Sequence, residues 1–161
     1  MSQVNTAVRA QPDNPGLPFK PPLPFLAAMV VGAGLHHLRP IRVRPVGWAP
    51  LGIVIVLLAV LVLLWAMAAF RRKRTPLEPW KATRAIVDDG PFAFSRNPVY
   101  IAFAMVEVGV GLWSDKLAVV ALVIVPVVLI ATMVVPREEE YLRRKFGAEY
   151  LDYCARVRRW V

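Results

Sequence analysis

The segment WAPLGIVIVLLAVLVLLWAMAAF, residues Trp48 to Phe70, contains no charged side chain. An α-helix needs about 17–25 apolar residues to cross the hydrocarbon core of a bilayer, and this segment lies within that range. Polar residues begin immediately after it, with Arg71 and Arg72. The segment therefore predicts a membrane-spanning helix and sets the fold class.

Three more apolar segments lie around it, at Pro24 to Leu38, Pro98 to Trp113 and Leu117 to Val135. The segments Pro24 to Leu38 and Pro98 to Trp113 are marginal in length for a crossing of about 17–25 residues, although tilting or a locally thinned bilayer compensates for a shortfall. The sequence thus predicts an all-α integral membrane protein with four transmembrane helices. The last two segments along the chain, Pro98 to Trp113 and Leu117 to Val135, are expected to form a hairpin, because only a short turn separates them.

The composition agrees with a membrane protein. The chain has 161 residues, 57% of them hydrophobic, yet its formal net charge is +9. The apolar residues come in long runs and the charges lie between them, which is typical of membrane proteins. Anionic lipid headgroups attract such flanking basic residues, so the excess positive charge requires no nucleic-acid partner.

The basic residues also predict an orientation. If the N-terminus is cytoplasmic, sixteen of the 20 Lys and Arg residues lie on the cytoplasmic side. Positive residues are enriched in cytoplasmic loops, so both termini are expected there. Four basic residues remain on the opposite side, and three of them follow the first apolar segment: Arg39, Arg42, Arg44 and Lys116.

The two ends of the chain differ in character. Residues 1–22 are rich in proline and lack an apolar core, so they predict a mobile arm rather than a signal peptide. Residues 23–161 are expected to form a single membrane domain. Apolar residues recur at helical spacing in the C-terminal part, which predicts an amphipathic interfacial helix: Leu142, Phe146, Tyr150 and Tyr153.

Two polar motifs bracket the predicted hairpin. The first is GPFAFSRNPVY, from Gly90 to Tyr100, and the second contains Glu138, Glu139 and Glu140. Asn97 and Pro98 are favoured residues for starting a helix, and acids complement the dipole of a helix N-terminus. Alternatively, the first motif places Arg96 and Asn97 at a helix N-terminus, which can bind an anion, and the acids can bind a cation.

Glu107 is the only acid within an apolar segment. Ionisable residues inside a membrane are costly and often functional, but a protonated, hydrogen-bonded core glutamate is the alternative. Helical spacing puts it on the same face as Asn97 and Tyr100, so we expect it to line the path of a substrate. No cluster of residues at metal-ligand spacing is present, so no metal is expected.

Together these motifs resemble the membrane methyltransferases of the isoprenylcysteine carboxyl methyltransferase and phospholipid methyltransferase group, especially its small bacterial members. The resemblance covers about residues 71–161. It rests on Gly90-Pro91-Phe92, on Arg96-Asn97-Pro98-Val99-Tyr100, on the acids that precede Leu142, on Phe146-Gly147-Ala148-Glu149-Tyr150 and on the ending from Tyr153 to Arg159. Asn97 departs from the His of eukaryotic members, and Ala102 departs from a common Gly.

The resemblance implies S-adenosylmethionine as methyl donor, bound at the cytoplasmic membrane face within residues 71–161. Arg96 or Arg156 would orient a carboxylate acceptor, whereas Glu107 or Glu139 would accept the proton of an amine acceptor. Glu107 is also the expected substrate-binding residue. The expected cofactor-binding residues are Arg84, Val87, Gly90, Phe92, Asn97, Pro98, Tyr100, Glu138 and Glu139.

The sequence therefore predicts a methyltransferase for a lipophilic acceptor, either a carboxylate such as an isoprenylcysteine-like group or a phospholipid amine. Its location would be the bacterial inner membrane, among membrane lipids, and its oligomeric state is left open. Two alternatives stay open as well. One is a non-enzymatic membrane scaffold, and the other is a small transporter that uses Glu107.

Overall fold

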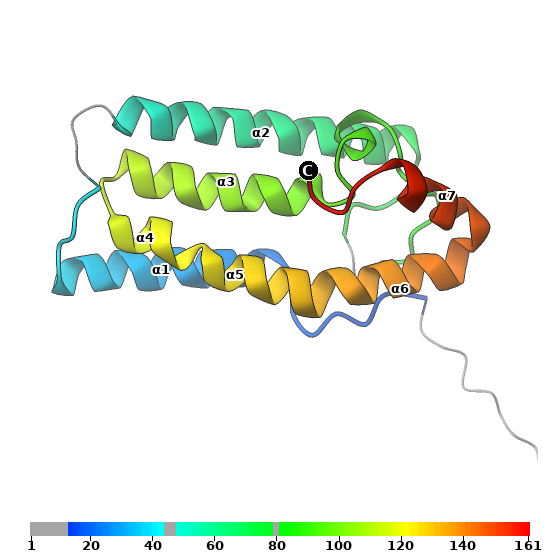
Figure 1. Ribbon diagram of the computed structural model, residues 1–161, viewed down its shortest axis with the longest axis horizontal. Coiled ribbons are helices and arrows are strands. Elements are labelled where there is room, and N and C mark those ends of the chain that lie inside the picture. Colours follow the sequence, from blue (N-terminus) through cyan, green and yellow to red (C-terminus); the bar gives the residue numbers. More distant parts are fainter. Residues whose placement is uncertain (1–12, 44–47, 79–80) are drawn as a thin grey trace, which may run out of the picture.

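The computed structural model describes residues 13–43, 48–78 and 81–161. Within these ranges the chain is helical and contains no strand (Figure 1), which confirms the all-α prediction. The elements are α1 (Pro22–Leu38), α2 (Trp48–Arg72), the 3-10 turn η1 (Gly90–Ala93), α3 (Pro98–Trp113), α4 (Leu117–Leu122), α5 (Ile124–Leu129), the π-helical turn η2 (Ile130–Val134), α6 (Val135–Phe146) and α7 (Ala148–Arg156).

Helices α4, α5, η2 and α6 form one continuous helix, Leu117–Phe146. Its two irregularities lie one turn before a proline. Pro126 lacks the N–H that would bond the carbonyl of Leu122, and α4 ends at that residue. Pro136 likewise lacks the N–H that would bond the carbonyl of Thr132, which lies in the wider turn η2. Pro136 therefore does not end the helix, because η2 absorbs its missing hydrogen bond.

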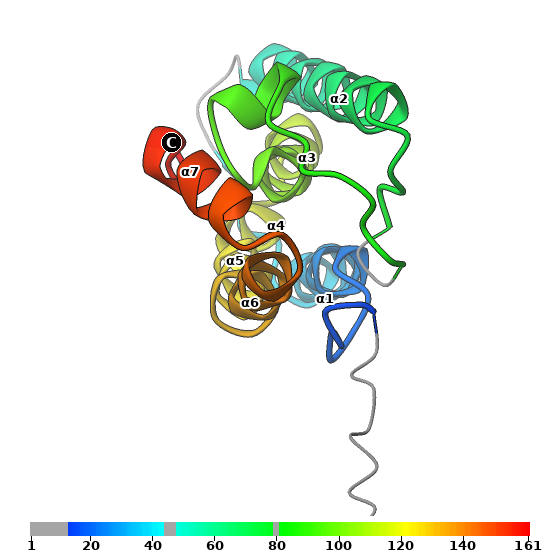
Figure 2. The same ribbon diagram turned by 90° about the vertical axis from the view of Figure 1, so that its right-hand side faces the viewer.

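The helices form an elongated bundle. Figure 1 shows α3 between α2 and the continuous helix, and the end-on view of Figure 2 shows α1 beside that helix. Helices α2 and α3 approach closely, since a Cβ added to Gly52 would lie 2.5 Å from the carbonyl oxygen of Gly109. Any larger residue at Gly52 would push these two helices apart.

Two helices are long and apolar enough to cross a membrane, namely α2 and Leu117–Phe146. Only 17% and 28% of their most apolar windows are buried, whereas the core helix of a soluble protein would be mostly buried. The other two predicted crossings correspond to α1, with 17 residues, and α3, with 16 residues. They are shorter than a full span, so the prediction of four crossings is supported for two helices only.

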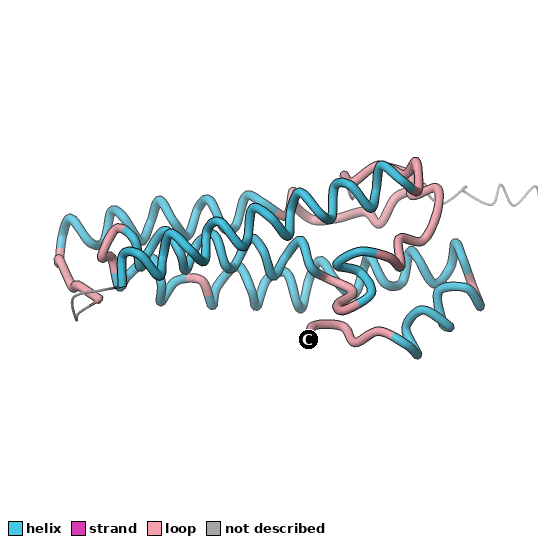
Figure 3. Tube along the Cα trace, turned by 90° about the horizontal axis from the view of Figure 1, so that it is seen from above, coloured by secondary structure: helices cyan, strands magenta, loops and turns pink. Residues whose placement is uncertain are grey.

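The predicted C-terminal amphipathic helix is divided into two. Gly147 has φ of 54°, a left-handed conformation that favours glycine, and it ends α6 and turns the chain into α7. The apolar residues of the two helices nevertheless lie in one core cluster, which includes Leu142, Tyr150 and Tyr153. Figure 3 shows that α7 and the long connection between α2 and α3 lie at the same end of the bundle.

Candidate functional site

A cavity of about 270 Å³ lies at this end of the bundle. Segments far apart in the sequence build its wall, including the residues before α1, the connection between α2 and α3, and helices α3, α6 and α7. Its lining residues are Pro15, Pro21, Pro22, Phe70, Pro76, Leu77, Glu78, Thr83, Ala85, Ile86, Val87, Phe92, Arg96, Asn97, Pro98, Val99, Tyr100, Phe103, Glu138, Tyr141, Leu142, Tyr150 and Tyr153.

Ionic and polar contacts fix the connection between α2 and α3 against the end of α2. Arg72 donates to Asp89 over 2.8 Å, and Lys73 donates to Asp88 over 2.9 Å. The hydrogen bond from Lys73 lowers the pKa of Asp88 below its usual value of 3.8, so the pair is charged at neutral pH. These contacts hold Val87, which is buried, at the wall of the cavity.

Helix α3 begins at Pro98, as the sequence predicts, but the side chain of Asn97 does not cap it. The Asn97 amide instead donates to the backbone carbonyl of Arg159 over 2.8 Å. The backbone N–H of Arg96 donates to the carbonyl of Arg158 over 2.9 Å. The chain after α7 is thereby fixed alongside the start of α3, where Arg96 and Asn97 line the cavity.

The two polar motifs meet inside the cavity. The Tyr100 hydroxyl on α3 donates to a carboxylate oxygen of Glu138 on α6 over 2.6 Å. Both residues line the cavity. The continuous helix thus returns Glu138 to the helix start at Asn97, as we expected from the sequence.

The neighbouring acid, Glu139, has different partners. Arg159 donates to both of its carboxylate oxygens, over 3.0 and 2.6 Å, and Arg96 lies 3.1 Å from one of them. Arg96 also donates to the Cys154 sulfur over 2.7 Å. Its Nε atom is buried and has no hydrogen-bond partner among the described residues. Arg96 is among the residues that line the cavity.

Two tyrosines of α7 complete the wall. Tyr153 donates its hydroxyl to the Phe92 carbonyl over 2.9 Å, which joins α7 to η1. Burial raises the pKa of the Tyr150 and Tyr153 phenols above the usual value of 10.0, so both are protonated at neutral pH. They therefore act as neutral hydrogen-bonding groups in this wall.

The structure brings seven of the predicted site residues to the cavity wall. These are Val87, Phe92, Arg96, Asn97, Pro98, Tyr100 and Glu138. The other five, Arg84, Gly90, Glu107, Glu139 and Arg156, do not line it. Their roles in binding or catalysis stay predictions, as do those of the seven.

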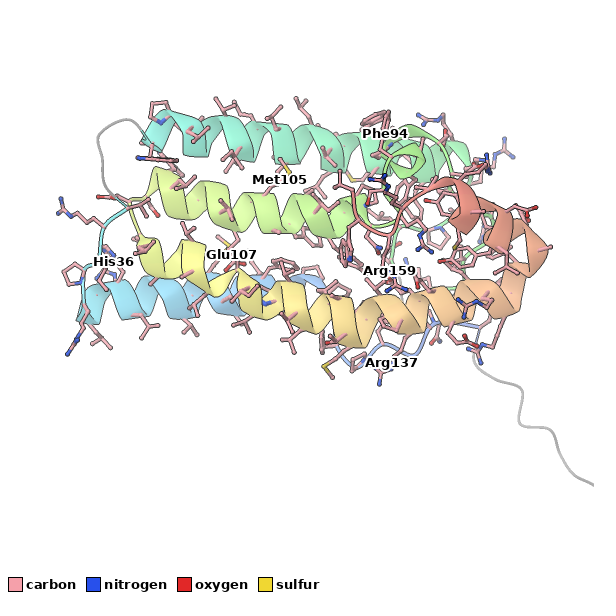
Figure 4. All side chains as sticks on the ribbon, in the orientation of Figure 1. His36, Phe94, Met105, Glu107, Arg137 and Arg159 are labelled. Carbon is pink, nitrogen blue, oxygen red and sulfur yellow. The ribbon has the colours of Figure 1, made fainter. Side chains whose placement is uncertain are left out.

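Among the five, Arg156 is largely exposed and lies 3.6 Å from Asp88, outside the cavity. Glu107 is completely buried in α3, and neither of its carboxylate oxygens has a partner among the described residues. In Figure 4, Glu107 lies between the end that carries Arg159 and Phe94 and the opposite end that carries His36.

Sequence reasoning missed the contributions of Pro15, Pro21, Tyr141 and Phe70 to the wall. For the prolines, the FKPPLPF stretch from Phe19 to Phe25 was the available signal, because aromatic and apolar residues alternate there with proline. Residues 13–21 belong to the predicted mobile arm, and Pro15 and Pro21 of this segment line the cavity. Residues 1–12 of that arm lie outside the described residues.

A second, apolar cavity lies beside α3. Residues of α1, α2, α3 and the continuous helix line it together with Trp160, and Tyr100 belongs to both cavities. Its lining residues are Phe25, Ile55, Tyr100, Ile101, Ala104, Met105, Val108, Val127, Ile130 and Trp160. Tyr100 is thus shared by the second, apolar cavity and the first, which we call the polar cavity because Arg96, Asn97 and Glu138 are among its lining residues.

The sequence model of the phospholipid methyltransferase family matches residues 48–149, which include α2, α3, the continuous helix and most of the cavity wall. The chain belongs to the phospholipid methyltransferase family. The family is one of methyltransferases, so membership supports a methyltransferase activity and, with the two long apolar helices, an association with membranes.

The chain is also similar to an uncharacterized protein of Haemophilus influenzae, with 33% identity over 63 residues. That match covers 39% of this chain and 100% of the relative. No solved structure matches the chain.

Proposed function

We propose that this protein is an integral-membrane methyltransferase that binds S-adenosylmethionine in the polar cavity and methylates a lipophilic acceptor. The observation that carries the proposal is the contact between Tyr100 and Glu138, which unites the two polar motifs of the family-matched region. It places a carboxylate inside a cavity that is otherwise largely apolar and aromatic.

The cavity residues fit the polar groups of this methyl donor. Glu138 offers a carboxylate for an ammonium group or ribose hydroxyls, through charge-assisted hydrogen bonds. The unpartnered Nε of Arg96 offers a donor for a carboxylate. The aromatic side chains of Phe92, Tyr150 and Tyr153 offer apolar surface for a purine ring.

The apolar cavity is the proposed site of the acceptor's hydrocarbon chain. Its lining surface is apolar, and it adjoins the donor cavity at Tyr100. A lipophilic molecule in it would hold its reactive group near Tyr100. This arrangement brings two reactants together, and positioning of that kind supplies a large part of the rate enhancement in such reactions.

The bound donor supplies a methyl group on a sulfonium, which is a good leaving group, so no nucleophilic side chain is required. The protein's part is to orient the acceptor. Arg96 is the arginine at the cavity wall that can orient a carboxylate acceptor. For an amine acceptor, Glu138 is a cavity carboxylate that can take up the proton, because Glu78 pairs with Lys81 and Glu139 is held by Arg96 and Arg159.

We further propose that α1 and α3 cross the membrane together with the two longer helices, with the donor cavity and both termini at the cytoplasmic face of a bacterial inner membrane. At 1.5 Å per residue their 17 and 16 residues span about 25 Å, so the bilayer would need to thin slightly around them. The positive charge of the C-terminal region supports this orientation.

The test is binding and turnover with the full chain in detergent. Isothermal titration should give a dissociation constant in the micromolar range for S-adenosylhomocysteine, the demethylated product. Labelled S-adenosylmethionine and a bacterial lipid extract should then give a labelled lipid. Absence of binding at millimolar ligand would contradict the proposal and favour a non-enzymatic scaffold.

A further inference from the structure

The segment before α1 is part of the cavity. We call residues 13–21 the N-terminal strap. Pro15 and Pro21 line the polar cavity, while Leu17 and Phe19 pack against the core cluster that contains Tyr100. The strap therefore covers one side of the site that the family-matched region builds, although it lies outside that region.

One hydroxyl joins the strap to two other parts of the wall. Tyr141 on α6 donates to the Asp13 carboxylate over 2.9 Å. The same oxygen accepts from the Thr83 backbone N–H and from the Lys145 ammonium, each over 3.1 Å. Lys145 also forms an ion pair with Asp13.

The Tyr141 hydroxyl thus acts both as a donor, to Asp13, and as an acceptor, from Thr83 and Lys145. Its ring is buried, with 4% exposure, so the hydroxyl is held in place. Thr83 belongs to the connection between α2 and α3, and it lines the cavity too. Tyr141 thus links the strap, that connection and α6 at one point.

The strap has little freedom between its two attachments. At one end Asp13 contacts α6, and at the other Pro21 is buried at the start of α1. Pro15 and Pro18 fix their own φ angles, which reduces the conformations open to the segment between them. Gly16, at φ of 57°, makes the turn near the attached end, where its N–H donates to the Asn14 side chain.

We infer that the N-terminal strap is the outer wall of the methyl-donor site and that Tyr141 is the positioning residue that holds it closed through Asp13. The inference rests on the proposed function, since it names the ligand of the cavity. A molecule in the cavity cannot leave past Pro15 while Asp13 remains bound to Tyr141 and Lys145. Release of the Asp13 contacts therefore opens a route for the donor and its product.

The test uses Asp13→Asn, Tyr141→Phe and the double variant in the full chain, with S-adenosylhomocysteine as the probe. Asp13 is largely exposed, so its substitution does not endanger folding. Each single variant should bind the probe about three- to tenfold more weakly, mainly through faster dissociation. The double variant should lose less affinity than the sum of the two single losses, because both single variants break the same contact between Asp13 and Tyr141, while the ion pair of Asp13 with Lys145 is lost only where Asp13 is changed.

The matched control is Asp115→Asn, which changes a half-buried acid at the opposite end of the bundle that accepts from the Val43 N–H over 2.8 Å. It should leave affinity and dissociation rate unchanged. In turnover, the strap variants should raise the KM for the donor without lowering kcat, whereas general loosening of the fold would lower both affinity and kcat.

The outcomes separate the two proposals. If the wild-type protein binds the probe and both single variants match it in affinity and dissociation rate, the strap inference is wrong and the proposed function stands. Additive losses in the double variant would overturn the role of Tyr141 as the holder of Asp13. If the wild-type protein itself fails to bind the probe, the proposed function is wrong, and the strap cannot be the wall of a methyl-donor site.

Discussion

Glu138 and Glu139 are neighbours in sequence, yet they have different interaction partners. Glu139 is bound by Arg96 and Arg159 and connects the C-terminal segment to the start of α3. Glu138 accepts a hydrogen bond from Tyr100 and lines the cavity. A carboxylate with two arginine partners is compensated, so the acid that remains for a ligand is Glu138.

Glu138→Gln should therefore weaken the binding of S-adenosylhomocysteine. The amide keeps an acceptor for Tyr100 but loses the charge, and a charge-assisted hydrogen bond contributes about 1.5–3 kcal/mol, or roughly a tenfold to hundredfold change in affinity. Titration calorimetry measures the loss. Glu140→Gln is the control, because Glu140 is exposed on the same helix and pairs with Arg143. Equal affinities for the two variants would indicate that Glu138 only complements the dipole of its helix and does not bind the ligand.

The Asp13 contact predicts a distinct dependence on pH. Hydrogen bonds from Lys145 and Tyr141 lower the pKa of Asp13 below 3.8, and the Asp13 partner raises the pKa of Lys145 above 10.5. The contribution of ionised Asp13 to the stability of this contact is present above pH 3.8 and is lost as the pH falls through its lowered pKa. The contribution of protonated Lys145 is present below pH 10.5 and is lost as the pH rises through its raised pKa.

Between these limits both groups are charged, so the ratio of dissociation rates for Asp13→Asn and wild type should be the same at about pH 5.5 and about pH 8.5. Stopped-flow displacement of S-adenosylhomocysteine measures both rates. A ratio that changes severalfold across this interval would show that a different titrating group controls the strap.

The helices show which parts of the fold the sequence could predict. The bounds of α3 match the apolar segment Pro98 to Trp113, because composition changes abruptly at both ends. The break at Gly147 was not predicted, since the spacing of Leu142, Phe146 and Tyr150 continues through it. Periodicity reports which residues share a buried cluster, but a backbone turn can preserve that cluster while dividing the helix.

The site was predictable to the extent that its residues lie in short motifs. Arg96, Asn97 and Tyr100 fall within five positions of one another, and Glu138 follows from the return of the hairpin. The strap and Tyr141 depend on contacts between residues 128 positions apart, which no local pattern encodes. Glu107 shares the helical spacing of Asn97 and Tyr100 but is not among the lining residues of either cavity, so its expected role in the acceptor path stays a prediction.

Glu107 is packed within α3 with both carboxylate oxygens unpartnered among the described residues. An unsatisfied buried polar group costs about 1–3 kcal/mol, so Glu107→Met, of similar volume, should raise the unfolding temperature in detergent. The affinity for S-adenosylhomocysteine should not change. The prediction from sequence that Glu107 lines the acceptor path requires altered turnover in Glu107→Gln, and unchanged turnover of every acceptor in that variant would contradict it.

The candidate functional groups are concentrated at one end of the bundle, the rich end, and are sparse at the other end. Both polar motifs, the strap and α7 gather at the first, while the short connection between α3 and α4 lies at the second (Figure 1). Most of the basic residues belong to segments at the rich end. In the four-crossing topology that we propose, this asymmetry favours a cytoplasmic position of the cavity, where the proposed methyl donor would be available.

The same asymmetry gives a topology test that needs no cysteine-free background. Cys154, the single native cysteine, lies in α7 at the cavity end, whereas Ser114 follows α3 at the other end. A membrane-impermeant maleimide added to intact cells should label Ser114→Cys and leave the wild-type protein unlabelled, because the bilayer separates the reagent from Cys154. After permeabilisation the reagent reaches both ends, so the difference between the two proteins should shrink. Labelling of the wild type in intact cells, or of Ser114→Cys only after permeabilisation, would place the cavity on the outer face and overturn the orientation.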